Sequence, residues 1–302
     1  MKKNSLPIML LSLGLVACSS TSVPVTEVEP DEGNYVSEPE EITSVSVQQQ
    51  PIEQLGQDSY QVEVKIEDKQ NHKEAFDWYQ KAAQQGDATA QYQLGLMYTK
   101  GDGVQQDYQQ AVNWYLQSAN QGYAQAQSNL GVMYSDGLGV EQDYKQAFNW
   151  YQKAAEQGYA SAQFNLALMY GKGEGTEQDY KQSANWFAKA AQQDHAEAQS
   201  NLGVMYTFGR GVDKNSKEAA NWYQKAAKQG DINAQVNLGI LYIKGEGVEQ
   251  DYQQAYAWLT LAANSGHQQA DKIIQRLRES MSPSSLDSAQ NLAIQYSKRY
   301  AN

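Results

Sequence analysis

Apolar and small residues return with a fixed spacing along most of this chain. Tryptophan marks the period most clearly, because every gap is 36 residues: Trp78, Trp114, Trp150, Trp186, Trp222 and Trp258. Tyrosines from Tyr98 to Tyr242, leucines from Leu94 to Leu238 and alanines from Ala90 to Ala270 keep the same spacing. A period of this length indicates an array of repeated supersecondary units.

Each period predicts two helices. In the opening unit, Ala90, Leu94, Met97 and Tyr98 fall on one face of a helix over 88–99. Asp or Asn then stands at the predicted start of each second helix, where its side chain can accept a free backbone N–H. These predicted N-caps are Asn71, Asp107, Asp143, Asp179, Asn215 and Asp251.

Glycines are predicted to end the helices. Two glycines separated by one residue follow each first helix, as in Gly101 and Gly103, and allow the chain to leave the helix. A glycine also ends the second helices, except that Asp194 takes this place once. Asp tolerates the left-handed conformation better than most residues.

The repeat pattern weakens after Gly266. Residues 269–280 still predict a helix, Ser282 to Ser285 are expected to interrupt it, and residues 286–300 predict a last helix. Polar terminal helices are suited to capping a solenoid. The predicted fold is therefore all-α: an α-solenoid of paired antiparallel helices over 71–266, with capping helices over 267–302.

The segment from Ala126 to Gly158 carries the full pattern Ala-x-x-x-Leu-Gly-x-x-Tyr-x-x-Gly-x-Gly-Val-x-x-Asp-Tyr-x-x-Ala-x-x-Trp-Tyr-x-x-Ala-Ala-x-x-Gly. This pattern resembles the Sel1-like repeat, a relative of the tetratricopeptide repeat, and the resemblance covers about 71–266. Departures are few: Ala167 replaces the helix Gly, Thr176 replaces Val, Ser183 replaces Ala, and Asn215-Ser216 replaces Asp-Tyr.

The first 17 residues predict a signal peptide. Two lysines precede an apolar run of about eleven residues from Leu6 to Val16, which is too short to span a bilayer. Leu15-Val16-Ala17-Cys18 resembles the lipobox of bacterial lipoproteins, which implies that Cys18, the single cysteine, is lipidated. By the same resemblance, Ser19 favours the outer membrane; an ordinary cleaved signal peptide with an incidental cysteine is the alternative.

Residues 18–70 predict an acidic disordered tether. From Ser19 to His72 there are 12 acidic residues and two lysines, a net charge of −10, whereas residues 73–302 carry only −4. Low hydrophobicity combined with net charge favours disorder. Alternation from Tyr60 to Ile66 would also allow one short strand. The overall charge of −12 argues against nucleic acid as a partner.

No motif in the sequence predicts catalysis, a cofactor or a metal site. His72, His195 and His267 sit in separate units and are expected at surfaces or turns. The Gly-x-Gly loops lack the Lys-Ser/Thr ending of a phosphate-binding loop and recur in every unit, as turns do. Some cysteine-rich relatives resemble β-lactam-hydrolysing proteins, but this chain has no cysteine after Cys18.

Partner-binding residues are expected where the repeats differ from one another. The resemblance implies that first helices line the concave face, where the sequence varies at Tyr92 and Phe164 and presents an amide ladder that includes Asn129, Asn165 and Asn201. The position at the start of the glycine loop also varies, and Phe208, with Arg210 close to it in sequence, is a candidate there; the other loops have Lys100, Asp136, Lys172 and Lys244. An alternative is that the asparagines only bond to neighbouring backbone.

The predicted function is that of an envelope-anchored scaffold or adaptor, not an enzyme, which binds a protein or peptide partner on the concave face. The repeat domain is expected in the periplasm, attached to the outer membrane through Cys18. A surface-exposed virulence or host-interaction factor is the main alternative, and a β-lactam-hydrolysing enzyme is a remote one.

Overall fold

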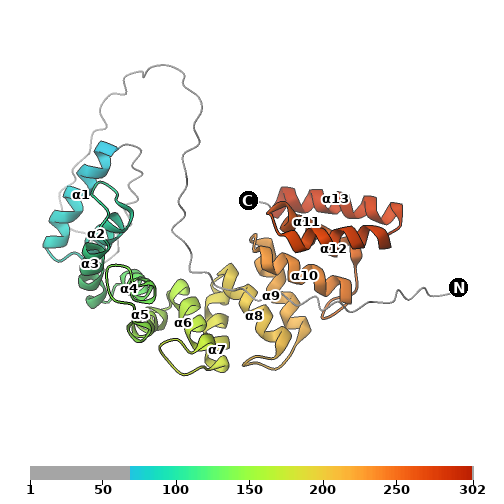
Figure 1. The fold of residues 1–302 in the computed structure, drawn as a ribbon, viewed down its shortest axis with the longest axis horizontal. Helices are drawn as coiled ribbons and strands as arrows, with labels where there is room; N and C mark the ends of the chain where they lie inside the picture. Colours follow the sequence, from blue (N-terminus) through green and yellow to red (C-terminus); the bar gives the residue numbers. More distant parts are fainter. Residues whose placement is uncertain (1–68, 301–302) are drawn as a thin grey trace, which may run out of the picture.

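The computed structural model describes residues 69–300, which form an all-helical solenoid (Figure 1). Its helices in chain order are α1 (Lys69–Gln84), α2 (Ala88–Lys100), α3 (Tyr108–Asn120), α4 (Ala124–Asp136), α5 (Tyr144–Glu156), α6 (Ala160–Lys172), α7 (Tyr180–Gln192), α8 (Ala196–Phe208), α9 (Ser216–Lys228), α10 (Ile232–Lys244), α11 (Tyr252–Asn264), α12 (Gln268–Ser280) and α13 (Pro283–Tyr300). The predictions for the signal peptide, Cys18 and the strand at 60–66 concern residues outside this range. The tether predicted over 18–70 also lies outside it, except for Lys69 and Gln70, which belong to α1.

The predicted pairing of helices is confirmed. The even-numbered helices from α2 to α10 are the first helices of the repeats, and the odd-numbered helices from α3 to α11 are the second. Five N-caps of second helices are also confirmed, since each accepts two backbone N–H groups; Asp143, for example, accepts from Lys145 and Gln146 at 2.9 and 3.0 Å. Asp194 adopts the left-handed conformation (φ 61°).

Two helix starts differ from the predictions. Asn71 lies inside α1, which begins at Lys69, and is not an N-cap. The later caps are held extended because their N–H bonds to the preceding first helix, as Asp107 does to the Tyr98 carbonyl at 2.9 Å. The described chain has no first helix before Asn71. At the other end, α13 begins at Pro283 and not at 286, because proline suits the first position of a helix.

The core depends on small residues that let neighbouring helices approach. A Cβ at Gly131 of α4 would overlap the ring of Tyr151 of α5, and Gly203 meets Tyr223 in the same way. Alanines such as Ala147 and Ala162 are fully buried, as is every leucine of the Leu94–Leu238 series to within 1%. The aromatic rings therefore lie directly against the backbone of the partner helix.

The tryptophans of the second helices connect successive repeats, with one exception. Trp150 of α5 packs into the cluster built on α3 and α4, and is 8% exposed. Trp78 of α1 is 62% exposed. The difference follows from position, because the described chain has no repeat before α1 for Trp78 to cover.

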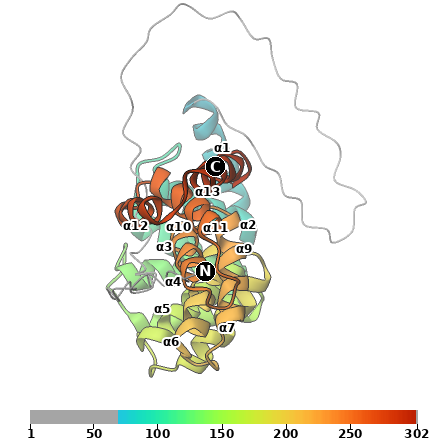
Figure 2. The same ribbon diagram turned by 90° about the vertical axis from the view of Figure 1, so that its right-hand side faces the viewer.

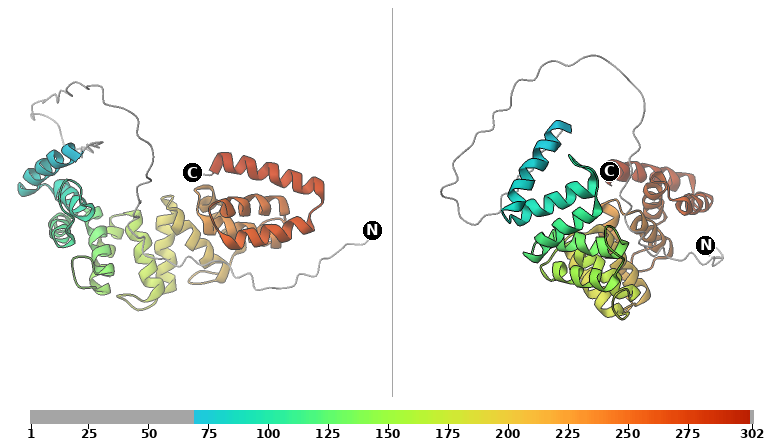
Figure 3. Two further views of the ribbon diagram at one scale, coloured as in Figure 1. Left: turned by 45° about the horizontal axis from the view of Figure 1, so that its top comes forward. Right: turned by 60° about the vertical axis from the view of Figure 1, so that its left-hand side comes forward.

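The C-terminal end of the solenoid is covered by α13, which packs on α11 (Figures 2 and 3). Tyr296 and Tyr300 lie over Trp258, with ring centroids 4.6 and 5.4 Å away. Trp258 is consequently 1% exposed. The helices of residues 69–300 include none that combines the length and the apolar character needed to cross a bilayer.

Candidate protein-interaction surface

Loops that join first to second helices follow one another along an edge of the solenoid. The second glycine of each loop contacts the start of the preceding second helix; a Cβ at Gly211, for instance, would overlap the Tyr180 carbonyl. Gly211 also has a left-handed φ of 72°, so both space and conformation require glycine there. Each loop is thereby placed next to the start of the second helix in the preceding repeat.

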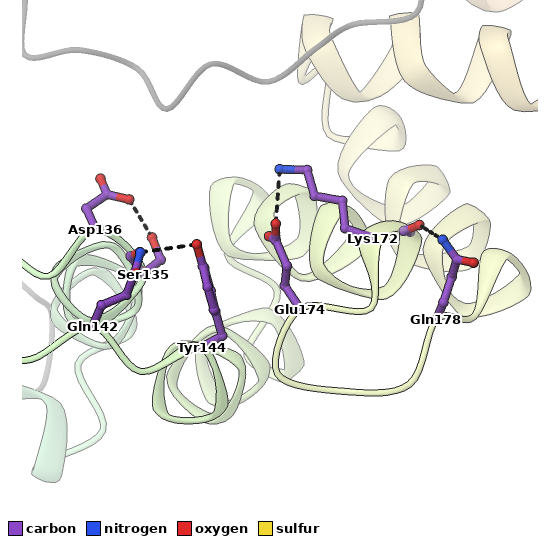
Figure 4. Close-up of polar contacts among 8 residues, drawn as sticks. Ser135, Asp136, Gln142, Tyr144, Lys172, Glu174 and Gln178 are labelled. Carbon is purple, nitrogen blue, oxygen red and sulfur yellow. Dashed lines mark hydrogen bonds and ion pairs between the residues drawn. The ribbon is translucent and has the colours of Figure 1, made fainter.

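Four of the five loops share a hydrogen-bonded brace. In the loop after α4, the Gln142 amide donates to the Ser135 carbonyl at 2.6 Å and to the Tyr144 hydroxyl at 3.1 Å (Figure 4). Gln106, Gln178 and Gln250 repeat these two bonds in their own loops. Figure 4 also shows the Lys172–Glu174 ion pair of the next loop, at 3.7 Å.

The loop between α8 and α9 lacks this brace. Lys214 replaces the glutamine, and Ser216 replaces the tyrosine. Phe208, at the end of α8, is 47% exposed, and Tyr180, at the start of α7, is 40% exposed. The Arg210 guanidinium lies 5.3 Å from the Phe208 ring centroid and 6.0 Å from that of Tyr180. We call Tyr180, Phe208, Arg210 and Lys214 the α8–α9 patch.

Charge also distinguishes this loop from the other four. Residues 208–217 contain three basic residues and one acidic residue, a net charge of +2. The equivalent ten residues of the other loops carry −1, −2, −1 and −2 in chain order. Within the described range, neither ion pair involves Arg210. Its guanidinium N–H groups therefore remain available to a carboxylate outside the domain.

Most other predicted site residues have contacts inside the solenoid. Tyr92 is half-buried, with its ring 5.1 Å from that of Tyr123. Burial raises its pKa, and a hydrogen bond with Asn129 opposes the rise. Phe164 stacks on His195 at 4.7 Å and packs against the core of the next repeat. Tyr92, Asn129 and Phe164 thus make contacts between neighbouring repeats, and little of their side-chain surface is left for a partner.

The asparagine ladder becomes progressively enclosed along the chain. Asn165 is half-buried, Asn201 is 9% exposed and Asn237 is fully buried. The Asn201 amide donates to the Glu197 carbonyl of its own helix at 2.9 Å. For Asn201, the alternative interpretation of backbone bonding is therefore confirmed. Of the seven predicted residues, the structure brings together only Phe208 and Arg210 on an exposed surface.

The histidines have separate structural contacts. His72 Nδ1 lies 3.2 Å from the Asp102 carboxylate. His195 precedes α8, and its Nδ1 accepts the Ala198 N–H at 3.4 Å. Burial lowers the pKa of His195. Across residues 69–300, no group of three or more His, Cys, Asp or Glu side chains is arranged to hold a metal ion.

Tyr180 and Lys214 complete the surface but were not among the predicted residues. Tyr180 belongs to a recurring Asp-Tyr pair, which the sequence pattern indicates only as part of the repeat. Lys214 was detectable, because it is the only loop residue that replaces the glutamine found at 106, 142, 178 and 250. Comparing the net charge of the five loops also singles out this one.

A solenoid of helix pairs with variable surface loops defines a class of repeat proteins that serve as protein-interaction scaffolds and are typically not enzymes. The Sel1 repeat matches six consecutive segments: 67–87, 88–123, 124–159, 160–195, 196–231 and 232–267. The chain therefore belongs to the Sel1 repeat family. Comparison with curated proteins found no match.

Solved structures that are similar to this chain include two proteins with more than 30% sequence identity. A Sel1 repeat protein from Oxalobacter formigenes is 37% identical over 67% of this chain, with a TM-score of 0.62. A protective antigen present in uropathogenic Escherichia coli is 34% identical over 76% of this chain, with a TM-score of 0.53. The chain spans 59% and 57% of their respective lengths.

Proposed function

We propose that this protein is an envelope-anchored adaptor that binds a protein partner through the α8–α9 patch. The observation that carries the proposal is the missing brace in the loop between α8 and α9. There the Arg210 guanidinium lies near two exposed aromatic rings and forms no ion pair within the described domain. Aromatic residues and arginine are the side chains most enriched at the energetic centres of protein interfaces. Phe208 and Arg210 take no part in a brace or in a core cluster, whereas Tyr180 accepts the brace bond of Gln178 through its hydroxyl and still exposes 40% of its surface.

A capture experiment in intact cells tests the proposal. Wild type is compared with a Phe208→Ala/Arg210→Ala double variant and with a matched Lys244→Ala/Glu246→Ala control in the next loop. We expect one envelope protein to crosslink to wild type and the control, and its yield to fall at least about tenfold in the double variant, as loss of an interface centre predicts. Equal capture by all three proteins would contradict the assignment.

The proposed anchor rests on Cys18 and the lipobox around it. Several acyl chains hold a protein on a membrane stably, whereas a single chain binds only marginally. A Cys18→Ser variant should therefore leave the membrane fraction or accumulate with its signal peptide. Unchanged membrane association and normal processing of this variant would refute lipid anchoring at Cys18.

A second candidate is a surface-exposed role in contact with a host. The similar protein from uropathogenic Escherichia coli is described as a protective antigen, which favours exposure of that protein to antibodies. Protease treatment of intact cells distinguishes the two topologies. Loss of the repeat domain places it at the cell surface, and its survival places it in the periplasm.

A further inference from the structure

The charge of the α8–α9 loop indicates which chemistry the patch selects. The whole chain carries −12, and the four other loops on the same edge are each net negative. Like charges repel an acidic partner from those loops, whereas the loop at 208–217, with its +2, attracts one. An acidic segment would thus be directed to one position on an otherwise unfavourable surface.

The side chains of the patch match the parts of such a segment. Arg210 presents a planar guanidinium, which pairs with carboxylates through two parallel hydrogen bonds. Its guanidinium carbon lies 5.3 Å from the Phe208 centroid and 6.0 Å from the Tyr180 centroid, and contact with these rings lowers the entropy cost of pairing. Lys214, an exposed side chain in the same loop, adds a second positive charge.

The exposed rings next to these charges indicate that the partner also carries an apolar group. Phe208 and Tyr180 are 47% and 40% exposed. Phe208 occupies a position that is Lys, Asp, Lys and Lys in the other four loops. An aromatic side chain of the partner can cover these rings, which a purely acidic surface cannot do.

From these observations we propose that the α8–α9 patch docks an acidic, extended segment of a second protein that also carries an aromatic side chain. Arg210 and Lys214 pair with its carboxylates, while Phe208 and Tyr180 cover the aromatic group. A polyanion such as nucleic acid fits poorly, because its phosphates would also meet the negative loops on either side. This inference rests on the proposed function and specifies its partner.

Peptide binding to the full chain tests this inference. The probes are a fluorescein-labelled peptide of repeated Glu-Glu-Tyr units and its Gln-Gln-Tyr counterpart, measured by fluorescence anisotropy at low and high salt. We expect the acidic peptide to bind at least about tenfold more tightly than its counterpart, and this preference to shrink at high salt.

Two variants with the same change in net charge show where the peptide binds. Arg210→Gln/Lys214→Gln removes the charges of the patch and restores the glutamine of the other loops, so the loop should still fold. Lys100→Gln/Lys244→Gln removes two charges elsewhere on the same edge. The inference expects about a tenfold loss in the first variant and less than twofold in the second. Equal losses in both, or equal binding of both peptides, overturn it.

The chain's own acidic residues provide a competing occupant. Between 27 and 41 there are seven carboxylates and no basic residue: Glu27, Glu29, Asp31, Glu32, Glu38, Glu40 and Glu41. If replacing these with Gln or Asn strengthens peptide binding several-fold, this segment occupies the patch and a second protein does not. Failure of the charge preference leaves the cell-based capture result intact, so the inference and the proposed function fail separately.

Discussion

At the residue scale, individual exceptions to the repeat carry more information than the repeat itself. Lys214, Ser216 and Phe208 all depart from the pattern within one loop, and together they remove a hydrogen-bonded brace and expose a ring. By contrast, Ala167 replaces the usual helix glycine and is fully buried in one cluster with Phe187, whose position holds Tyr in α3, α5 and α9 and Leu259 in α11. One departure changes the surface, whereas the other adjusts the core.

His195 gives a prediction for the dependence of stability on pH. Its Nδ1 accepts the Ala198 N–H, and its ring stacks on Phe164, so the neutral form is required. Because burial lowers its pKa from 6.5, its contribution to stability is complete above about pH 6.5 and is lost as the pH falls toward the folded-state pKa.

A His195→Asn variant tests this contribution, because asparagine can accept the same N–H without titrating in this range. We expect its free energy of unfolding to fall less than that of wild type between about pH 7 and pH 5. Parallel curves for the two proteins, measured by urea unfolding, would show that His195 does not contribute.

At the element scale, each second helix is stabilised by the repeat before it. Trp150 contacts the cluster of α3 and α4, and Trp258 is covered by the added helix α13. Helix α1 has no such neighbour among the described residues, and its Trp78 is exposed. Tryptophan at the same repeat position therefore contributes differently to stability in α1 than in α5 and α11.

This difference predicts unequal effects of one substitution. Trp150→Ala should lower the free energy of unfolding by roughly 3–5 kcal/mol, because a large side chain is removed from a packed interior. Trp78→Ala should cost only about 0.5 kcal/mol, as is usual at exposed positions. Chemical denaturation of both variants provides the measurement, and similar losses would mean that the exposure of Trp78 is not that of the folded protein in solution.

Helices and their boundaries were predictable from the sequence, because the 36-residue period and the Asp and Gly positions fix them repeatedly. The errors came at the two ends, where the repeat has no neighbour on one side: Asn71 lies within α1, and α13 starts at Pro283. Asn71 matches the capping position of the later repeats but has no preceding first helix among the described residues, and Pro283 starts α13 within the run from Ser282 to Ser285, which was expected to lie between helices.

At the scale of the whole molecule, the candidate surface was predictable only in part. Phe208 and Arg210 were identified because they differ from the consensus, and they lie together on the surface. Tyr92, Phe164 and Asn201 also vary or recur at helix positions. Contacts between repeats occupy Tyr92 and Phe164, and a bond to the backbone of its own helix occupies Asn201. Sequence variation alone does not separate a residue that adjusts packing from one that faces solvent.

The solenoid thus combines a uniform edge with one exceptional position. Four braced, acidic loops lie in the same solenoid as one basic loop, which joins α8 to α9. Figure 1 shows α8 and α9 between the neighbouring repeats. In this account, the repeats supply a rigid support, and the binding specificity is concentrated in one of them. The segment that precedes α1 supplies the proposed attachment to the envelope.

Site-specific photocrosslinking tests this account most directly. A photoreactive amino acid replaces Lys214 in one version of the full-length protein and Lys100, in the first of the five loops, in another, and both are irradiated in intact cells. We predict that one envelope protein crosslinks at position 214 and not at position 100. Equal crosslinking of that protein from both positions, or crosslinking from position 100 alone, would contradict binding at the α8–α9 patch.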